Sequence, residues 1–401
     1  MYNVRQVCED TWMCGASDRR IQLFENVYPV PDGVSYNDYV ILDQKTCLLD
    51  GVDSSVRDQF LENLEHVLDG RPLDYMVVHH MEPDHAAVLA DLVLRYPDLT
   101  VVASAQAFKM MGQFFDFDLA DRKLVVKEGS TLELGKHTLA FVAAPMVHWP
   151  EVLVSFDTTT GALFSADAFG SFGALGGNVW ADEVEWDRDY AAEARRYYVN
   201  IVGKYGLQTT NLLKKAGKLD IKYLFPLHGY LWRRDLGKFI DLCAKWASYT
   251  PEVDSVCVFY GSIYGHTANA ASILAAKLAD RGLRNVRVFD VSKTDCSELV
   301  SRAFEYSTLV FASSTYNMGI FDRMDSFVDD LAKHNLQKRT VGIIQNGTWA
   351  PQSGALLKER LGALRDVTVL DPMVQMVSAV KPQTLDQLDA LADALAASIQ
   401  K

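Results

Sequence analysis

The stretch HHMEPDHAAVL, residues 79–89, decides how this sequence is interpreted. It directly follows LDYMVV, an apolar run that indicates a buried strand. Alternate positions hold His80, Glu82 and Asp84, and His85 comes next. Because a loop that leaves a strand can turn alternate side chains to one side, these donors could converge on metal ions. The alternative is a charged loop in which Asp84 caps the following helix.

Three more ligand-type residues stand where apolar runs end. His148 follows TLAFVAAPMV, Asp167 ends GALFSAD, and His228 follows IKYLFPL. Sites in α/β folds gather at the carboxyl ends of strands. Taken singly, Asp167 could be a turn residue and His228 a loop histidine. Together with the first stretch they make a donor set suited to two adjacent metal ions: His80, Glu82, Asp84, His85, His148, Asp167 and His228.

Composition narrows the class of protein. The chain has 401 residues, of which 49% are hydrophobic and 23% charged, as in an ordinary globular protein. The net charge of −13 argues against nucleic-acid binding, and no apolar run reaches the roughly 20 residues that span a bilayer. The N-terminal MYNVRQVCEDTWMCG lacks an apolar signal core, and the six scattered cysteines form no C-x-x-C pair. We therefore expect a cytoplasmic protein without a disulfide framework or an attached iron–sulfur module.

The pattern of the chain changes near Pro251. Before it, short apolar runs such as DYVILD, KTCLLDG and HTLAFVAA alternate with turns and with helical stretches such as VRDQFLENLEHVLD. After it, strands and helices alternate regularly, as in SVCVFYG followed by TANAASILAAKLADRG. Regular alternation predicts a doubly wound parallel sheet. The sequence thus predicts an α/β protein with a layered domain over residues 1–250 and a doubly wound domain over residues 251–401.

The order H-x-E-x-D-H, His, Asp, His resembles the metal signature of flavodiiron proteins, whose metal domain has the αββα metallo-β-lactamase fold. Glu82 stands where zinc hydrolases of that fold carry a second histidine, and a carboxylate favours iron over zinc. The resemblance implies that one iron takes His80, Glu82 and His148. It implies that the other takes Asp84, His85 and His228, and that Asp167 bridges the two irons. His79, where many members have asparagine, is expected to be structural.

Three loops of the C-terminal segment resemble the flavodoxin FMN site. GSIYGHT after the first strand resembles the phosphate loop S/T-x-x-G-x-T, although a generic helix-starting turn is the alternative. STYNMG after a later strand suits the flavin ring, with Tyr316 as the stacking residue. NGTW departs from the S-Y-G-W-S-G typical of the third loop, and Trp349 could instead be a core residue. The resemblance implies FMN contacts from Ser262, Ile263, Tyr264, Gly265, His266, Thr267, Ser314, Thr315, Tyr316, Asn317, Met318, Gly319, Asn346, Gly347, Thr348 and Trp349.

The resemblance covers essentially the whole chain and implies an oxidoreductase of the minimal two-domain class. Two ferrous ions and FMNH2 carry four electrons, enough to reduce O2 to water, and two electrons suffice to couple two NO into N2O. The expected electron donor is a separate protein, commonly rubredoxin. The expected assembly is a head-to-tail homodimer, possibly paired into a tetramer, in which each flavin faces the partner's irons. The alternatives are a zinc hydrolase with a flavodoxin-like module and a noncatalytic flavin carrier.

The segment RRYYVNIV, residues 195–202, predicts a helix with two adjacent tyrosines. In similar proteins a tyrosine from this segment approaches the metal pocket and hydrogen-bonds a bound diatomic. Adjacent helix residues point about 100° apart, so only one tyrosine can face the metals. The sequence analysis favours Tyr198 over Tyr197 as this catalytic residue. The alternative is that both rings only pack in the core.

Overall fold

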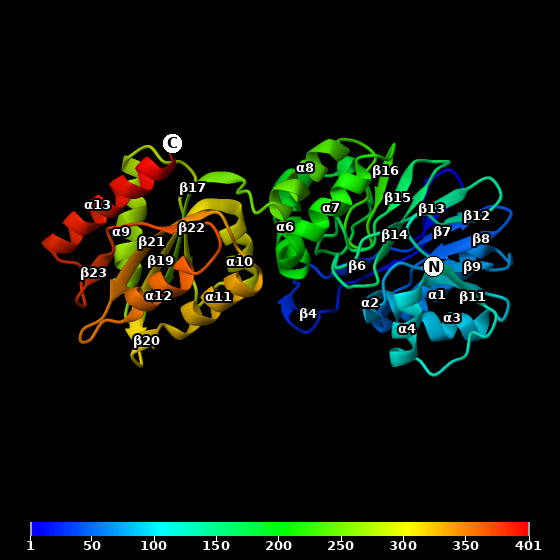
Figure 1. Cartoon of the computed structure of the whole chain (residues 1–401), viewed down its shortest axis with the longest axis horizontal. Helices are drawn as coiled ribbons and strands as arrows, with labels where there is room; N and C mark the ends of the chain where they lie inside the picture. The colour runs from blue at the N-terminus through cyan, green and yellow to red at the C-terminus, as the bar shows by residue number, and fades with distance from the viewer. Residues whose placement is uncertain (1, 400–401) are drawn as a thin grey trace. The chain divides into compact units, whose positions relative to one another are not determined.

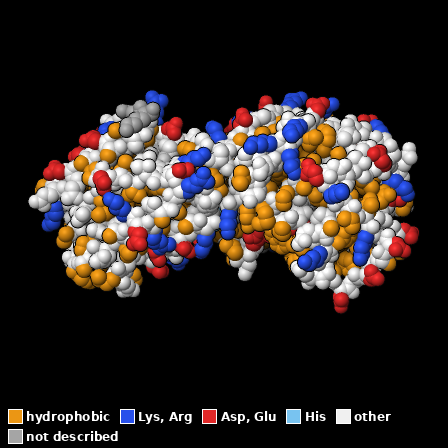
Figure 2. Space-filling model, viewed as in Figure 1, with side chains coloured by type: hydrophobic (Ala, Val, Ile, Leu, Met, Phe, Trp, Pro, Cys, Tyr) orange, Lys and Arg blue, Asp and Glu red, His pale blue; other side chains and the backbone are white. Residues whose placement is uncertain are grey.

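The computed structural model describes residues 2–399 and divides into two compact units, Met1–Ala244 and Lys245–Lys401 (Figure 1). Acidic and basic side chains are interspersed over the visible surface of both units (Figure 2). Among the described residues, no helix has both the length and the apolar character required to cross a bilayer.

Two mixed sheets form the centre of the first unit. The first sheet has the order β1-β2-β7-β8-β9-β10-β11, and the second has the order β12-β13-β14-β15-β16. Their strands are β1 (Arg5–Cys8), β2 (Thr11–Met13), β7 (Tyr39–Leu42), β8 (Thr46–Leu49), β9 (Tyr75–Val78), β10 (Thr100–Ser104), β11 (Lys123–Val126), β12 (Thr131–Glu133), β13 (Thr138–Ala143), β14 (Leu153–Asp157), β15 (Ala162–Phe164) and β16 (Tyr223–Phe225). Two small antiparallel sheets of two strands each lie beside them, β3 (Ala16–Asp18) with β6 (Val34–Tyr36) and β4 (Leu23–Phe24) with β5 (Tyr28–Pro29).

The two sheets pack face to face because their strands alternate apolar side chains on one side. Tyr39 and Val77 of the first sheet share one buried cluster with Phe141, Phe164 and Phe225 of the second. Helices cover the outer faces (Figure 1), which makes the αββα arrangement that the sequence predicts. These helices are α1 (Arg57–Leu68), α2 (Pro83–Ala86), α3 (Leu89–Arg95), α4 (Ala105–Phe114), α5 (Trp186–Asp189), α6 (Ala191–Tyr197), α7 (Gly206–Ala216) and α8 (Leu236–Ala247).

The second unit is a parallel sheet with the strand order β18-β17-β19-β21-β22, and β23 also pairs in parallel with β21. In order of sequence this is 2-1-3-4-5, the flavodoxin-like order, whose topological switch point lies between β17 and β19. The elements are β17 (Val253–Gly261), α9 (His266–Asp280), β18 (Arg287–Asp290), α10 (Cys296–Glu305), β19 (Tyr306–Tyr316), β20 (Gly319–Ile320), α11 (Asp322–Lys333), β21 (Arg339–Asn346), α12 (Ser353–Gly362), β22 (Val367–Val369), β23 (Val374–Met376) and α13 (Pro382–Ile399). The doubly wound fold predicted for this segment is confirmed.

Two helix predictions need correction in detail. The helical stretch predicted after the opening motif is divided into α2 and α3, and α2 begins at Pro83. Proline suits the first helical position because its missing N–H has no intrahelical partner there, so Glu82 becomes the N-cap and Asp84 lies inside the helix. The helix predicted over residues 195–202 is α-helical only to Tyr197 and continues as a π-helix over Tyr198–Val202.

Candidate metal centre and cofactor pocket

Strand register brings the seven predicted metal ligands to one end of the first unit. β15 pairs in parallel with β16, with Phe164 opposite Phe225. Asp167 and His228 each lie three residues beyond this pair, so they leave the sheet at the same level. His80 and Glu82 lie in the loop between β9 and α2, Asp84 and His85 lie in α2, and His148 lies in the loop between β13 and β14.

The seven side chains form two adjacent groups of donor atoms. In the first group, one donor atom from each of His80, Glu82, His148 and Asp167 lies within 4.8 Å of the others. Asp84, His85 and His228 form the second group by the same measure. The sequence prediction divided the residues in this way, apart from the bridging position that it assigned to Asp167.

Asp167 lies between the two groups. Its Oδ2 atom is 3.3 Å from Nε2 of His80 and 3.3 Å from Nε2 of His148. Its Oδ1 atom is 3.0 Å from Nε2 of His85 and 3.6 Å from Nε2 of His228. One carboxylate oxygen therefore faces each group, which is the geometry that a ligand shared by two metal ions requires.

The buried carboxylates of the cluster favour positive charge on the groups beside them. Burial alone lowers the pKa of His85, but the Asp84 and Asp167 carboxylates outweigh this effect and raise it to about 10. Burial is likewise outweighed at His148, where Asp167 and Glu82 raise the pKa to about 9. Without metal, protons on these imidazoles must balance the buried carboxylates.

Several buried donor atoms lie within ion-pair distance of one another but form no hydrogen bond of good geometry within residues 2–399, namely both oxygens of Asp84 and Nε2 of His148 and of His228. Buried polar groups in native proteins are normally satisfied, and here the free atoms converge. Cations at the two groups would supply both the missing charge and the missing partners. A set of carboxylates and imidazoles suits iron, so the residues fit a diiron centre.

Two of the histidines are held by a hydrogen bond at Nδ1, the ring nitrogen that does not face the cluster. His80 Nδ1 lies 2.8 Å from Oε1 of Glu151, and His228 Nδ1 lies 2.7 Å from the carbonyl oxygen of Ser35. Both contacts require a hydrogen on Nδ1, which leaves Nε2 as the donor toward the cluster. Neither Glu151 nor Ser35 carries a sequence signal that marks it as a partner of these histidines.

His79 has a different role from its neighbour His80. Its Nδ1 atom lies 2.5 Å from Oδ2 of Asp50, and its Nε2 atom lies 2.7 Å from Oγ of Ser155. Both ring nitrogens are thus engaged within the protein. His79 therefore links the end of β9 to Asp50, which follows β8, and to β14 of the second sheet.

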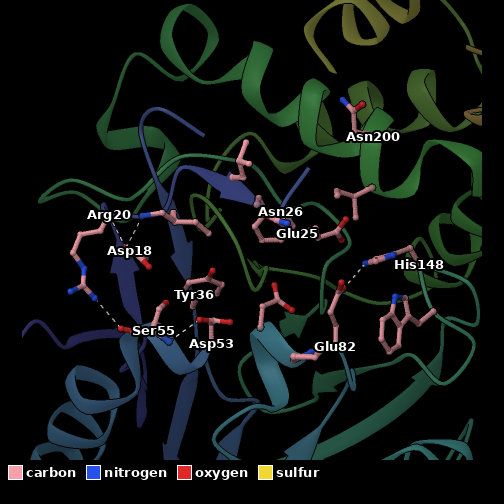
Figure 3. Close-up of a pocket in the computed structure, with 17 residues that line it drawn as sticks. Asp18, Arg20, Glu25, Asn26, Tyr36, Asp53, Ser55, Glu82, His148 and Asn200 are labelled. Carbon is pink, nitrogen blue, oxygen red and sulfur yellow. Dashed lines mark hydrogen bonds and ion pairs between the residues drawn. The ribbon is translucent and has the colours of Figure 1, made fainter. Parts of the chain in front are cut away.

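A cavity of about 1030 Å³ opens onto the cluster. Its wall includes Glu25, Glu82, Asp84, His148 and Trp149. Figure 3 shows Glu82 and His148 directed toward each other, with Glu25 nearby. Partial burial and the negative charge of Glu82 raise the pKa of Glu25 to about 8. The cavity gives small molecules access to the donor atoms, and the sequence analysis did not identify Glu25 as part of its wall.

Tyr197 is the tyrosine that the contacts bring to the cluster. Its ring centroid lies 5.5 Å from that of His228. A Cβ atom on Gly170, three residues after Asp167, would come within 2.6 Å of the Tyr197 ring. Burial raises the pKa of Tyr197, and the Asp167 and Asp84 carboxylates add to that shift. These contacts place Tyr197 beside the cluster, whereas the sequence favoured Tyr198, which is also buried.

The three predicted flavin loops enclose a second cavity, of about 400 Å³, in the other unit. They follow β17, β19 and β21 and meet at the topological switch point of the sheet, where flavodoxin-like folds bind ligands. Its wall contains Ser262, Ile263, Tyr264, His266, Thr267, Ser314, Thr315, Asn317, Met318, Asn346, Gly347, Thr348, Trp349 and Ser378. Gly265, Tyr316 and Gly319 lie in the same loops, and Ser378 joins the wall without having been predicted.

The chemistry of this cavity fits FMN. Gly265 is the N-cap of α9 with φ +91°, and glycine brings no side chain that could cap the first amide groups of the helix. Those amides and the hydroxyl groups of the loop can bind a phosphate. Tyr264 and Trp349 are 90% and 77% exposed, so the core alternative for Trp349 is wrong. Exposed aromatic rings beside such a cavity provide the apolar surfaces that a flavin ring needs.

Comparison with known proteins agrees with the architecture of both units. Residues 34–229 match the family model described as ODP family beta lactamase, and residues 258–371 match that of flavodoxin. A nitric oxide reductase of Moorella thermoacetica is 29% identical over 378 residues, which cover 91% of each chain. The anaerobic nitric oxide reductase flavorubredoxin of Escherichia coli is 28% identical over 352 residues, 86% of this chain and 73% of that protein.

Solved structures show the same architecture. Rubredoxin oxygen:oxidoreductase from Desulfovibrio gigas superposes with a TM-score of 0.91 at 26% identity, and the alignment covers 99% of this chain and 98% of that one. A flavoprotein from Thermotoga maritima superposes with a TM-score of 0.90 at 24% identity and the same coverage, which supports the fold.

Proposed function

The chain belongs to the flavodiiron proteins, and on that premise we propose that it reduces O2 to water, NO to N2O, or both. FMN in the flavodoxin-like unit receives electrons and a non-haem diiron centre uses them. The observation that carries this function is the position of Asp167, whose two oxygens face two separate groups of ligands. A flavin cavity in the same chain supplies the second element of a reductase.

In this proposal His80, Glu82 and His148 hold one iron, and Asp84, His85 and His228 hold the other. Asp167 is shared between them. When bound, the irons and the reduced flavin supply up to four electrons and two adjacent positions for a diatomic substrate. Glu151 and Ser35 keep the imidazoles of His80 and His228 in the tautomer that presents Nε2.

Tyr197 is proposed as the hydroxyl donor that faces the substrate. A hydroxyl group at this place can hydrogen-bond an oxygen atom on which negative charge develops during reduction. Its burial favours the role, because hydrogen bonds are stronger where water is excluded.

The zinc hydrolase is the second candidate function. Glu82 disfavours it, because a third carboxylate in the cluster raises the negative charge and provides a hard oxygen donor, which iron accepts more readily than zinc does. Iron and zinc analysis of the purified protein separates the two candidates. A noncatalytic flavin carrier is disfavoured by the complete donor set in the first unit.

The remaining proposals concern the partners. We propose a rubredoxin-type electron donor, a head-to-tail homodimer that could pair further into a tetramer, and a cytoplasmic location. Exposed apolar side chains around the flavin cavity, among them Tyr264, Met318 and Trp349, support docking of another protein surface at this cavity.

In a head-to-tail dimer, dilution to monomers should slow reoxidation of the reduced flavin while both cofactors stay bound. Reoxidation at an unchanged rate in monomers would contradict this assembly.

The decisive experiment measures turnover of the iron- and FMN-loaded protein, prepared anaerobically with a reduced rubredoxin-type donor. Measured amounts of O2 or of NO are then added to parallel samples, and consumption of each gas is compared. Water or N2O formation at a rate that depends on both cofactors supports the proposal. Loaded protein that consumes neither gas would exclude it.

A further inference from the structure

A buried carboxylate beside the metal centre has no visible partner. Asp38 is fully buried, and neither of its oxygens has a hydrogen-bond partner among the described residues. An isolated buried carboxylate is strongly destabilising to the folded state unless a donor or a cation offsets the lost hydration. A neighbouring group with an unused donor is therefore to be expected.

The residue across the sheet from Asp38 is Asp50, and it is not the missing donor. Asp38 immediately precedes β7, where Tyr39 pairs with Leu49 of β8, so Asp38 lies across from Asp50. Asp50 is already engaged, since it accepts from the backbone N–H of His79 and contacts the His79 ring. It therefore does not supply the missing donor.

Gly51, which follows Asp50, lies against the backbone of the helix that carries His85. A Cβ atom on Gly51 would come within 2.9 Å of the carbonyl oxygen of His85. Tyr36, two residues before Asp38, has its ring centroid 6.5 Å from that of His85. Burial raises the pKa of Asp38, and His85 is the group that acts against this shift.

His85 has a matching unused atom. Its Nε2 atom faces the cluster, 3.0 Å from Asp167 and 3.3 Å from Asp84. The Nδ1 atom on the other side of the ring is buried and lacks a hydrogen-bond partner in the described part of the chain. His80 and His228 both have an acceptor at Nδ1, so His85 is the exception among these three ligands.

We propose that Asp38 is the positioning residue for His85: one water molecule accepts a hydrogen bond from Nδ1–H of His85 and donates one to the Asp38 carboxylate, which holds Nε2 on the second iron. This inference rests on the proposed diiron function. It deepens that function by explaining why His85 acts as a ligand in this chain. An imidazole without such an acceptor can rotate away from the metal, whereas a carboxylate at Nδ1 orients the ring and makes Nε2 a stronger donor.

The test compares Asp38→Leu, His85→Asn and the double variant. Ferrous ion is titrated anaerobically into each protein in competition with a chelator, and FMN content is measured on the same samples. We expect Asp38→Leu to weaken binding of one of the two irons roughly 10- to 100-fold, with the other iron and FMN unchanged. Asp38→Asn, which retains an acceptor oxygen, should restore most of the affinity.

The double variant separates positioning from a general structural effect. If Asp38 acts through His85, Asp38→Leu has no further effect on iron binding in the His85→Asn background. Equal losses in both backgrounds, or weaker binding of both irons, would overturn the proposal. A parent protein that binds no pair of irons would instead overturn the proposed function, so the two failures are distinguishable.

A crystal structure of the iron-loaded parent protein decides the matter even if the Asp38 variants do not fold. The expected result is one water molecule within hydrogen-bond distance of both a carboxylate oxygen of Asp38 and Nδ1 of His85. A His85 ring turned away from the iron, or an Asp38 carboxylate bonded to other groups alone, would refute the positioning role.

Discussion

Replacing Asp167 with alanine tests the shared-ligand geometry most directly. Asp167 is buried, and its oxygens lie between 3.0 and 3.6 Å from Nε2 atoms of four histidines, two in each group of ligands. With iron bound, Asp167 would form buried ion pairs with both irons, and removing one partner of a buried ion pair costs about 3–5 kcal/mol of stability, here stability of the iron-loaded state. Because each 1.4 kcal/mol changes an equilibrium constant tenfold, we expect iron affinity to fall by roughly two to three and a half orders of magnitude.

The assay is anaerobic iron loading followed by gel filtration and metal analysis, with FMN quantified from its visible absorption. Asp167→Ala should lose both irons and all turnover while FMN stays bound, because the flavin cavity belongs to the other unit. The matched control is Asp157→Ala. Asp157 is also buried beside a histidine, with Oδ2 2.8 Å from Nδ1 of His137, but it lies outside the metal cluster.

Two outcomes would refute the reasoning. An Asp167→Ala protein that holds two irons with parental affinity would show that the carboxylate is not shared. An Asp157→Ala protein that loses iron to the same extent would show that the loss follows from general destabilisation of the unit rather than from the missing ligand.

Tyr197→Phe should lower O2 or NO turnover on the order of ten- to a hundredfold with unchanged iron and FMN content, whereas equal turnover in Tyr197→Phe and Tyr198→Phe would return both rings to a packing role. Gly265→Ala should weaken FMN binding roughly 5- to 30-fold in a fluorescence titration, because the φ of +91° at this residue costs other residues about 1–2 kcal/mol; unchanged affinity would show that the loop tolerates the strain. In iron-free protein the pKa values of His85 and His148 are raised, so protonation of these imidazoles stabilises the folded state. This stabilisation is complete below about pH 6.5, the pKa of an unfolded histidine, and is lost as the pH rises through 9 to 10. The melting temperature of the iron-free protein should therefore fall over that interval, and iron loading at pH 7 should release protons, so loading without proton release would contradict the protonated cluster.

Local signals in the sequence were sufficient for the fold and for predicting a set of ligand-type side chains that the structure brings together. Strand periodicity and turn residues predict the elements of both units, because apolar alternation reflects which side chains face a core. The motif of residues 79–85 and the three later ligand-type residues are visible because metal chemistry requires those residue types. The flavin loops are visible because a phosphate site needs a turn at the start of a helix.

Positions that depend on contacts between distant segments were decided only by the tertiary structure. Adjacent tyrosines are equivalent in sequence, and the choice between Tyr197 and Tyr198 depends on how the helix packs against the loop that carries Asp167. Glu151 is likewise an ordinary acidic residue until folding places it 2.8 Å from Nδ1 of His80. Asp38 precedes a strand without any motif, and only the pairing of β7 with β8 sets it across from Asp50, next to Gly51, which lies against the backbone of His85. The physical reason is that ligand chemistry restricts residue type locally, whereas orientation and hydrogen bonding arise between segments that the chain brings together on folding.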